Sequence, residues 1–266
     1  MNRWLVTGAG QSVCDAWMAA LDQRFAEDVF VLTDGPEVAG EARRLFGHTL
    51  IVQLPETVDP AEFDGVIDLA GGTVTETPCY VLPSPAKALV QRVLADVQVR
   101  GIVGALTEPA IAMPGGVEAL AGQVSQLFNG RDPDSEPFGG SLAFNQLRRD
   151  SAELEQWVMH AQGLGPEAVS LAVHQTDLFY TTTASLWIEA DASTVDALVA
   201  TSNTAMDACL AAAPSRGRAD DVACWQMATR VLTPTWVHVQ VYADTEYGVW
   251  VPAMVDWMCG LQEVHL

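Results

Sequence analysis

The chain has 266 residues, 49% of them hydrophobic and 18% charged, which suits one large or two small domains with a substantial core. It carries 13 Lys and Arg residues against 34 Asp and Glu residues, a net charge of −21. Such a field repels nucleic acid and anionic membranes, so we expect neither as a partner.

The cysteines are five in number and widely separated, without a CxxC pair. This pattern indicates neither a metal site nor a disulfide framework, and we expect no bound metal. The first residues lack the features of a signal peptide, and no uncharged apolar run reaches the roughly 20 residues of a membrane span. We therefore expect a cytoplasmic protein whose thiols are free and mostly buried.

The first third of the chain alternates between strand and helix patterns. We predict strands at 3–8, 28–35, 49–54 and 65–72 and a helix at 11–25. Strands that alternate with helices are typical of a parallel sheet.

The remainder has a mixed pattern. We predict helices at 85–97, 151–164, 193–213 and 248–261, another helix ending at Gly130, and strands at 79–82, 100–108, 141–147 and 236–244. The stretch 168–191 fits two adjacent strands or one long hairpin.

The first strand runs into a glycine turn, Gly8-Ala9-Gly10, ahead of a helix. Glycines at this point let a backbone approach the pyrophosphate of a dinucleotide, and Asp34 after the second strand could bind a ribose hydroxyl, which favours NAD. The third glycine of the usual pattern is replaced by Val13. The alternative is an ordinary tight turn that binds nothing.

A proline-rich turn, Pro83-Ser84-Pro85, separates the strand at 79–82 from the following helix. Ser84 fits the N-cap of that helix, with Pro85 at its first position. The alternative is a serine nucleophile served by His174. His174 and Gln175 are neighbours on a predicted strand, and neighbouring strand residues point to opposite faces. If Gln175 faces the pocket beside Ser84, His174 therefore faces away from it.

The segment PGGVEALAGQVSQLFNGRDPDSEPFGGSLAFNQL (114–147) resembles aspartate-semialdehyde dehydrogenases, and its nearest likeness is to the Usg-like branch. The resemblance implies an α/β plus α+β fold, with a Rossmann-like N-terminal domain and a mixed-sheet dimerisation domain. It places the first domain at 1–84, completed by the C-terminal helix at 246–266. Residues 85–245 would form the dimerisation domain and the homodimer.

Four positions that are catalytic in that family carry other residues here. Matching the motifs places Pro85 on the catalytic cysteine, Thr107 on a substrate-positioning glutamine, Gln175 on a substrate-binding arginine and Thr182 on the base histidine. Proline has no nucleophile, and threonine is no general base near neutral pH. About 40 residues that usually complete the family's nucleotide pocket are also missing before the strand at 79–82. The resemblance thus implies a fold without its catalytic residues.

These observations favour a non-catalytic protein that acts by dimerisation and by binding another protein or a ligand, with no cofactor. One alternative is an oxidoreductase that binds NAD(P) through Gly8, Ala9, Gly10 and Asp34. Another is an acidic partner of a true enzyme.

Overall fold

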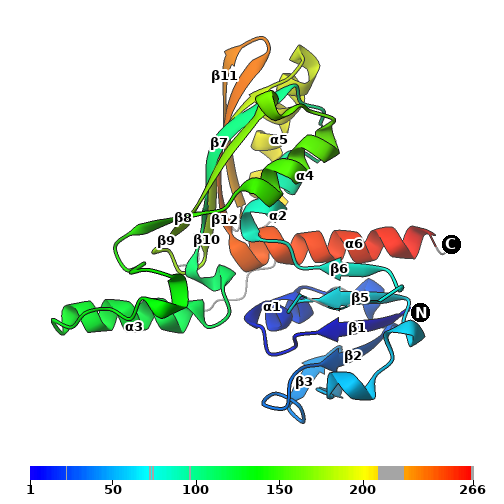
Figure 1. Ribbon diagram of the computed structural model, residues 1–266. Coiled ribbons are helices and arrows are strands. Elements are labelled where there is room, and N and C mark those ends of the chain that lie inside the picture. Colours follow the sequence, from blue (N-terminus) through cyan, green and yellow to red (C-terminus); the bar gives the residue numbers. More distant parts are fainter. Residues whose placement is uncertain (22, 72, 74, 96, 209–224, 265–266) are drawn as a thin grey trace. The chain divides into compact units, whose positions relative to one another are not determined.

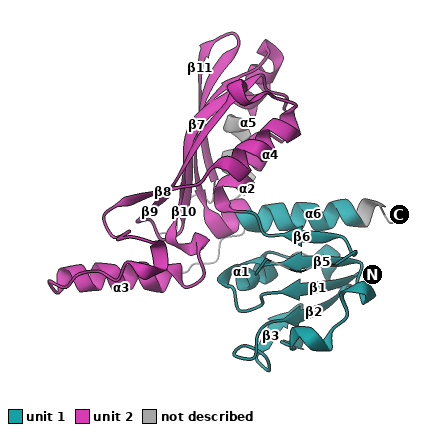
Figure 2. Ribbon diagram, in the orientation of Figure 1, with its two compact units in different colours: residues 1–83, 250–266 teal, residues 84–249 magenta. Residues whose placement is uncertain are grey.

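The computed structural model describes residues 1–264 except 22, 72, 74, 96 and 209–224. The chain forms two compact units: Met1–Pro83 joined by the segment from Trp250 onward, and Ser84–Val249 (Figure 2). The first contains a parallel sheet and the second a mixed sheet, which confirms the predicted combination of α/β and α+β architecture. Within the described residues, no helix is both long and apolar enough to cross a membrane.

The first unit is built on a parallel sheet in the order β2–β1–β5–β6 (Figure 1). Its strands are β1 (Arg3–Thr7), β2 (Val29–Thr33), β5 (Gly65–Asp68) and β6 (Cys79–Val81). Its helices are α1 (Ser12–Ala20), a short turn at Gln23–Phe25, and α6 (Val251–Val264). The parallel strands β5 and β6 are joined by residues 69–78 alone, which is shorter than the helical crossover usual for such a pair.

Aromatic side chains join α6 to the sheet of the first unit, with Trp4 buried and Trp257 and Tyr80 half-buried. Trp257 of α6 packs against Trp4 of β1 with ring centroids 6.0 Å apart, and against Tyr80 of β6 at 5.6 Å. Glycine is required at Gly65, because a Cβ atom there would lie 2.6 Å from the ring of Trp4. The last helix of the chain is therefore held by strands from the first 81 residues.

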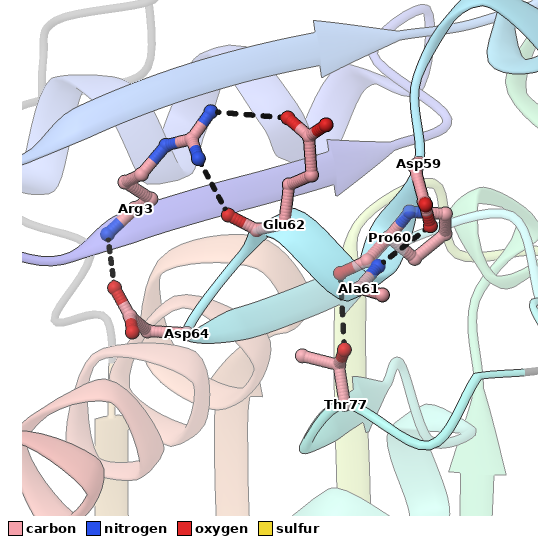
Figure 3. A network of polar contacts seen from close by, with 7 residues as sticks. All are labelled: Arg3, Asp59, Pro60, Ala61, Glu62, Asp64 and Thr77. Carbon is pink, nitrogen blue, oxygen red and sulfur yellow. Dashed lines mark hydrogen bonds and ion pairs between the residues drawn. The ribbon is translucent and has the colours of Figure 1, made fainter.

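A polar network at the start of β1 holds the segment that precedes β5 (Figure 3). Arg3 donates its backbone N–H to the Asp64 carboxylate and its guanidinium to the Glu62 carbonyl oxygen, each at 2.8 Å. Thr77 donates its hydroxyl to the Pro60 carbonyl oxygen at 3.0 Å, which ties the segment before β6 to the same turn. These contacts fix β5 beside β1 at the amino end of the sheet.

Residues 42–51 form an antiparallel hairpin of β3 (Ala42–Leu45) and β4 (His48–Ile51). The prediction of a single strand at 49–54 is wrong in its bounds, because β4 ends at Ile51. The prediction also lacks β3, the strand that pairs with β4. The turn residues Phe46 (φ 49°) and Gly47 (φ 83°) are both left-handed. A hairpin turn of this kind normally begins with Asn, Asp or Gly, so Phe46 conceals it in the sequence.

The second unit, within its described residues, is built on a six-stranded sheet in the order β11–β12–β10–β7–β9–β8. The strands are β7 (Gly101–Glu108), β8 (Gln146–Arg149), β9 (Val169–Thr176), β10 (Thr181–Glu189), β11 (Trp225–Thr233) and β12 (Trp236–Asp244). Of the two alternatives for 168–191, two strands are confirmed as β9 and β10. The hairpin is wrong, because β7 lies between these strands and pairs with both.

Among the described residues, helices cover one face of this sheet, and none covers the other face. They are α2 (Pro85–Val93), α4 (Ala152–Gln162) and α5 (Ala192–Ala208); α3 (Gly116–Phe128) follows β7 in the chain. The helix predicted at 193–213 is confirmed as far as Ala208, and residues 209–213 of the prediction lie outside the described residues. On the open face Val103, Trp187 and Tyr242 are each at least 40% exposed. We call this face, defined by these three residues, the open sheet face.

The strand predicted at 141–147 begins later, at Gln146. Phe144 lies in a turn instead, with a left-handed φ of 62°. Its exposed ring packs edge-on against Phe128 at 6.0 Å. The apolar residues before Gln146, which suggested a strand, therefore lie in a turn.

Candidate functional site

The glycine turn lies between β1 and α1. Gly8 has a φ of 77°, and a Cβ atom there would lie 2.8 Å from the backbone nitrogen of Ala70. The N–H groups of Gly8 and Ala9 both donate to the Thr33 carbonyl oxygen, at 3.0 and 3.2 Å. The N–H of Gln11 donates to the carbonyl oxygen of Gly8 at 3.0 Å. The turn is thus closed largely by its own backbone and by β2.

Asp34 takes the remaining donor of the turn. Its Oδ2 accepts from the Gly10 N–H at 2.5 Å, and its Oδ1 accepts from the Gly35 N–H at 2.6 Å. A Cβ atom built on Gly10 would lie 2.9 Å from a methyl group of Val38, so that side chain covers the turn. The predicted cofactor residues are brought together: Gly10 is bonded to Asp34, and the N–H groups of Gly8 and Ala9 are bonded to Thr33.

The first turn of α1 carries further negative charge. Asp15 lies in this turn, 3.4 Å from the guanidinium of Arg43, and the helix begins without a side-chain cap. A carboxylate here already complements the positive end of the helix. A pyrophosphate would meet Asp15 and Asp34 together, with the N–H groups of residues 8–11 bonded inside the unit. In this arrangement each N–H group of residues 8–11 already has an acceptor within the first unit, so a pyrophosphate would have to displace one of them.

A buried carboxylate at the end of β5 escaped the sequence analysis. Asp68 is 1% exposed and accepts from the Thr7 hydroxyl at 2.7 Å and from the N–H groups of Thr73 and Gly71 at 2.8 and 2.9 Å. Burial raises the pKa of this carboxyl, but the hydrogen bonds outweigh burial and hold the pKa below its usual value. The available signal was an aspartate inside the apolar run GVIDLAGG.

Helix α2 begins at Pro85 with Ser84 as its N-cap. The Ser84 hydroxyl accepts from the Lys87 N–H at 3.3 Å, which confirms the predicted capping role. The Glu108 carboxylate accepts from the Ala86 N–H at 3.1 Å. A carboxylate from β7 therefore stands at the start of this helix, where the helix dipole favours negative charge.

Thr107 and Glu108 point to opposite faces of the sheet. The Thr107 hydroxyl lies 2.7 Å from that of Thr183 and belongs to the open side, whereas Glu108 reaches the start of α2. His174 is paired with Thr107 in the β7–β9 register and shares its side. The structure therefore separates Ser84 and His174 by the sheet, and the alternative nucleophile–base pair does not form.

Gln175 and Thr182 lie on the helix-covered side, at most 1% exposed. The Gln175 Oε1 accepts from the guanidinium of Arg149 on β8, and the Thr182 hydroxyl lies 2.7 Å from that of Thr245. The Gln175 Nε2 has no partner among the described residues. Arg149 was missed by the sequence analysis, and it brings a positive charge to the buried amide.

The remaining groups that could react or bind a metal are the cysteines and the acidic side chains. In the described ranges, no three His, Cys, Asp or Glu side chains are placed to hold a metal ion. Burial, then the nearby Asp15, raises the pKa of Cys14 to about 12, and burial raises that of Cys79. Cys14, Cys79 and Cys259 are free thiols, while Cys209 and Cys224 lie outside the described residues. With raised pKa values, the thiols of Cys14 and Cys79 stay neutral and are poor nucleophiles.

Comparison with known proteins defines the class of fold. No family model and no curated protein matches the chain. Solved structures do match: a probable aspartate-semialdehyde dehydrogenase from Pseudomonas aeruginosa has 17% identity and a TM-score of 0.72, covering 97% of this chain and 98% of the other. The two compact units thus have the fold of a semialdehyde dehydrogenase.

Two further structures agree. Aspartate-semialdehyde dehydrogenase II from Vibrio cholerae, complexed with ASA, matches at 16% identity and a TM-score of 0.75, over 98% of both chains. The Francisella tularensis aspartate-semialdehyde dehydrogenase matches at 10% identity and a TM-score of 0.65, over 97% of this chain and all of the other. At these identities the likeness establishes the fold, which is that of aspartate-semialdehyde dehydrogenases.

Proposed function

We propose that this chain is a non-catalytic protein with the aspartate-semialdehyde dehydrogenase fold, of the Usg-like branch, that acts by dimerisation and by binding a protein or a ligand. The start of helix α2 carries the proposal. Pro85 occupies the position of the family's catalytic cysteine in the motif match, and a proline ring cannot form an acyl-enzyme. The donors beside it are already bonded, to the Ser84 hydroxyl and the Glu108 carboxylate.

The other motif positions support the same conclusion. Gln175 is neutral where the resemblance implies a substrate-binding arginine, and its amide is bonded to Arg149. Thr182 is fully buried and its hydroxyl is bonded to Thr245, so it has neither the basicity nor the access of a general base.

An activity assay tests the proposal. Purified protein is incubated with aspartate semialdehyde, NADP and phosphate, and NADPH formation is followed at 340 nm, with the Pseudomonas aeruginosa protein as positive control. We expect a rate equal to the protein-free background. Turnover above that background, lost on heat denaturation, would contradict the proposal.

The proposed homodimer uses residues 85–245, and the open sheet face supports it. Val103, Trp187 and Tyr242 expose large apolar side chains on this one face. Trp187 is stacked on His238 with ring centroids 4.5 Å apart, which holds it rigidly for packing against a second copy. Rigid aromatic anchors of this kind are enriched in protein interfaces.

Light scattering coupled to size exclusion tests the dimer. We expect twice the 28.5 kDa chain mass at micromolar concentration, and a shift to monomer for Trp187→Glu. Ile51→Glu places the same charge on another exposed apolar residue, in the first unit, and should leave the dimer intact. A wild-type monomer, or a dimer that survives Trp187→Glu, would rule out this interface.

The second candidate is an NAD(P)-binding oxidoreductase, favoured by the placement of Gly8–Gly10 between β1 and α1 with Asp34 after β2. Binding would require the Gly10 N–H to exchange Asp34 for a phosphate. A cofactor at 100 times its Kd stabilises a fold by about 2.7 kcal/mol. A thermal-shift scan with millimolar NAD and NADP decides: a saturable rise in Tm supports this candidate, and an unchanged Tm removes it.

A further inference from the structure

We propose that the first unit binds a small apolar amine in a cavity beside the β3–β4 hairpin. The cavity has a volume of about 370 Å³ and lies between the segment from Ala26 to Phe30 and the segment from Leu45 to Leu50. This volume is within the range of small-molecule sites, about 300–1,000 Å³. The inference does not depend on the proposed function, because no residue of the second unit contributes to the cavity.

The cavity is distinct from the glycine turn. It is formed where β2 begins, at Val29 and Phe30, whereas Asp34 and its contact with Gly10 follow the end of β2. The two places are therefore at opposite ends of the same parallel strand. A ligand in this cavity would not occupy the position of a dinucleotide, which in such sheets lies beyond the carboxyl ends of the strands.

Two aromatic rings form part of the cavity wall. The centroids of Phe30 and Phe46 are 6.5 Å apart with the planes tilted by 48°, and Trp17 supports Phe30 from behind at 5.8 Å. Phe46 has a φ of 49°, a backbone conformation that L side chains other than Asn and Asp rarely adopt. Glycine or asparagine would suit this turn better, and neither would supply a ring. Strained residues of this kind cluster at binding sites.

The carboxylates at the cavity favour a cation. The lining residues include the carboxylates of Glu27 and Asp28 and the imidazole of His48, and Glu27 is exposed. Asp28 accepts from the Asn2 N–H and from the Trp4 indole N–H, each at 2.8 Å, and lies 4.0 Å from the amino group of Met1, so Glu27 is the carboxylate left for a ligand. The ammonium group of such a ligand can therefore pair with Glu27 while the apolar part of the ligand lies against Phe46. The face of an aromatic ring also attracts a nearby cation. The chain's net charge of −21 favours the same sign of ligand.

The test uses 2-phenylethylamine and two matched probes that differ in charge, 2-phenylethanol and 3-phenylpropionate. Each is titrated to 10 mM into protein with labelled leucine and valine methyl groups, observed by NMR. We expect saturable shifts at Leu45, Leu50 and Val29 with the amine, and at least fivefold weaker binding of the alcohol and the carboxylate. Equal binding of amine and alcohol would overturn the ligand class, and unshifted methyl groups in folded protein would overturn the site.

Two variants locate the interaction. Phe46→Gly removes the ring and should weaken amine binding at least tenfold, and its hairpin should persist because glycine suits a left-handed turn. Phe144→Gly makes the same change at another left-handed phenylalanine, in the second unit, and should leave binding unchanged. Glu27→Gln should weaken the amine about two- to fivefold and leave the alcohol unaffected. Amine binding that is insensitive to both Phe46→Gly and Glu27→Gln would refute the proposal.

Discussion

The carboxylate of Asp34 accepts a hydrogen bond from the Gly10 N–H at 2.5 Å, so an internal anion occupies the turn in which the sequence pattern places a phosphate. Like a phosphate, this group is negatively charged, but it is a side chain of the protein and not a ligand. Asp34, positioned by β2, gives the turn the partner that its N–H requires. The glycines are explained by close backbone approach, at Gly8 against Ala70, without any cofactor.

Removing this internal anion should destabilise the first unit. Asp34→Ala deletes the acceptor of two N–H groups. Hydrogen bonds to charged groups contribute about 1.5–3 kcal/mol each, and solvent screening at the half-buried Asp34 reduces this contribution. We expect the free energy of unfolding in urea to fall by about 1–3 kcal/mol. Asp177→Ala, at an exposed position, should change it by less than about 0.5 kcal/mol. Equal effects of the two substitutions would show that the contact is not structural.

Ser84 and Ser151, at the N-caps of α2 and α4, make a matched pair. Ser84 caps α2 through its hydroxyl, whereas Ser151 precedes α4 without a side-chain capping bond. Ser84→Ala should therefore cost about 1 kcal/mol of unfolding free energy, and Ser151→Ala no more than a few tenths. Chemical denaturation followed by circular dichroism measures both. A larger loss at Ser151 would contradict the assignment of the cap.

The negative charge at the start of α2 is testable by neutralising Glu108. Glu108→Gln keeps an acceptor for the Ala86 N–H and removes the interaction with the helix dipole, so we expect a loss of about 0.3–1 kcal/mol. Glu37→Gln is the control, because this exposed carboxylate lies in a turn outside the helices, and its neutralisation should change the free energy of unfolding by less than about 0.5 kcal/mol. In 1 M salt the Glu108 effect should shrink, since the dipole interaction is screened.

Cys14 should make stability depend on alkaline pH. Burial, and then Asp15, raises its pKa to about 12 in the folded state, against about 8.5 in an unfolded chain. Below pH 8.5 both states keep the proton and stability is unaffected. Between about 8.5 and 12 the unfolded state loses the proton first, so stability falls by up to about 1.4 kcal/mol per pH unit.

Comparison of the wild type with Cys14→Ala isolates this contribution. The wild type should lose stability more steeply than the variant from pH 8.5 to 10.5. Iodoacetamide at pH 8 should leave Cys14 unmodified in native protein and alkylate it in urea, as seen by peptide mass spectrometry. Parallel pH slopes, or alkylation of the native thiol, would show that Cys14 is accessible to solvent.

Local chemistry accounts for the features that the sequence predicted well. A serine followed by proline before a helical pattern defines a cap from a few neighbouring residues, and Ser84 and Pro85 behave accordingly. The insertion of β7 between β9 and β10 depends on pairing between distant segments, which no local pattern encodes. Phe46 and Phe144 adopt conformations that their side chains disfavour, so tertiary packing overrides their preference.

The candidate site was harder to predict, because one residue decides the face of a strand. The motif match placed Thr107 on the family's substrate-positioning glutamine, but Thr107 contacts Thr183 on the open side of the sheet. Its neighbour Glu108 contacts the start of α2. A shift of one residue reverses every side chain in a strand. Arg149 escaped for another reason: its contact with Gln175 runs between strands whose pairing the sequence did not reveal.

The packing of Trp257 against Trp4 and Tyr80 has a consequence for biosynthesis. The strands of the first unit leave the ribosome before the second unit, but α6, which packs against them, is made after it. The second unit is continuous, Ser84–Val249, and is fully available before that helix emerges. The second unit should therefore fold before the first, whose sheet remains incompletely covered until α6 has left the ribosome.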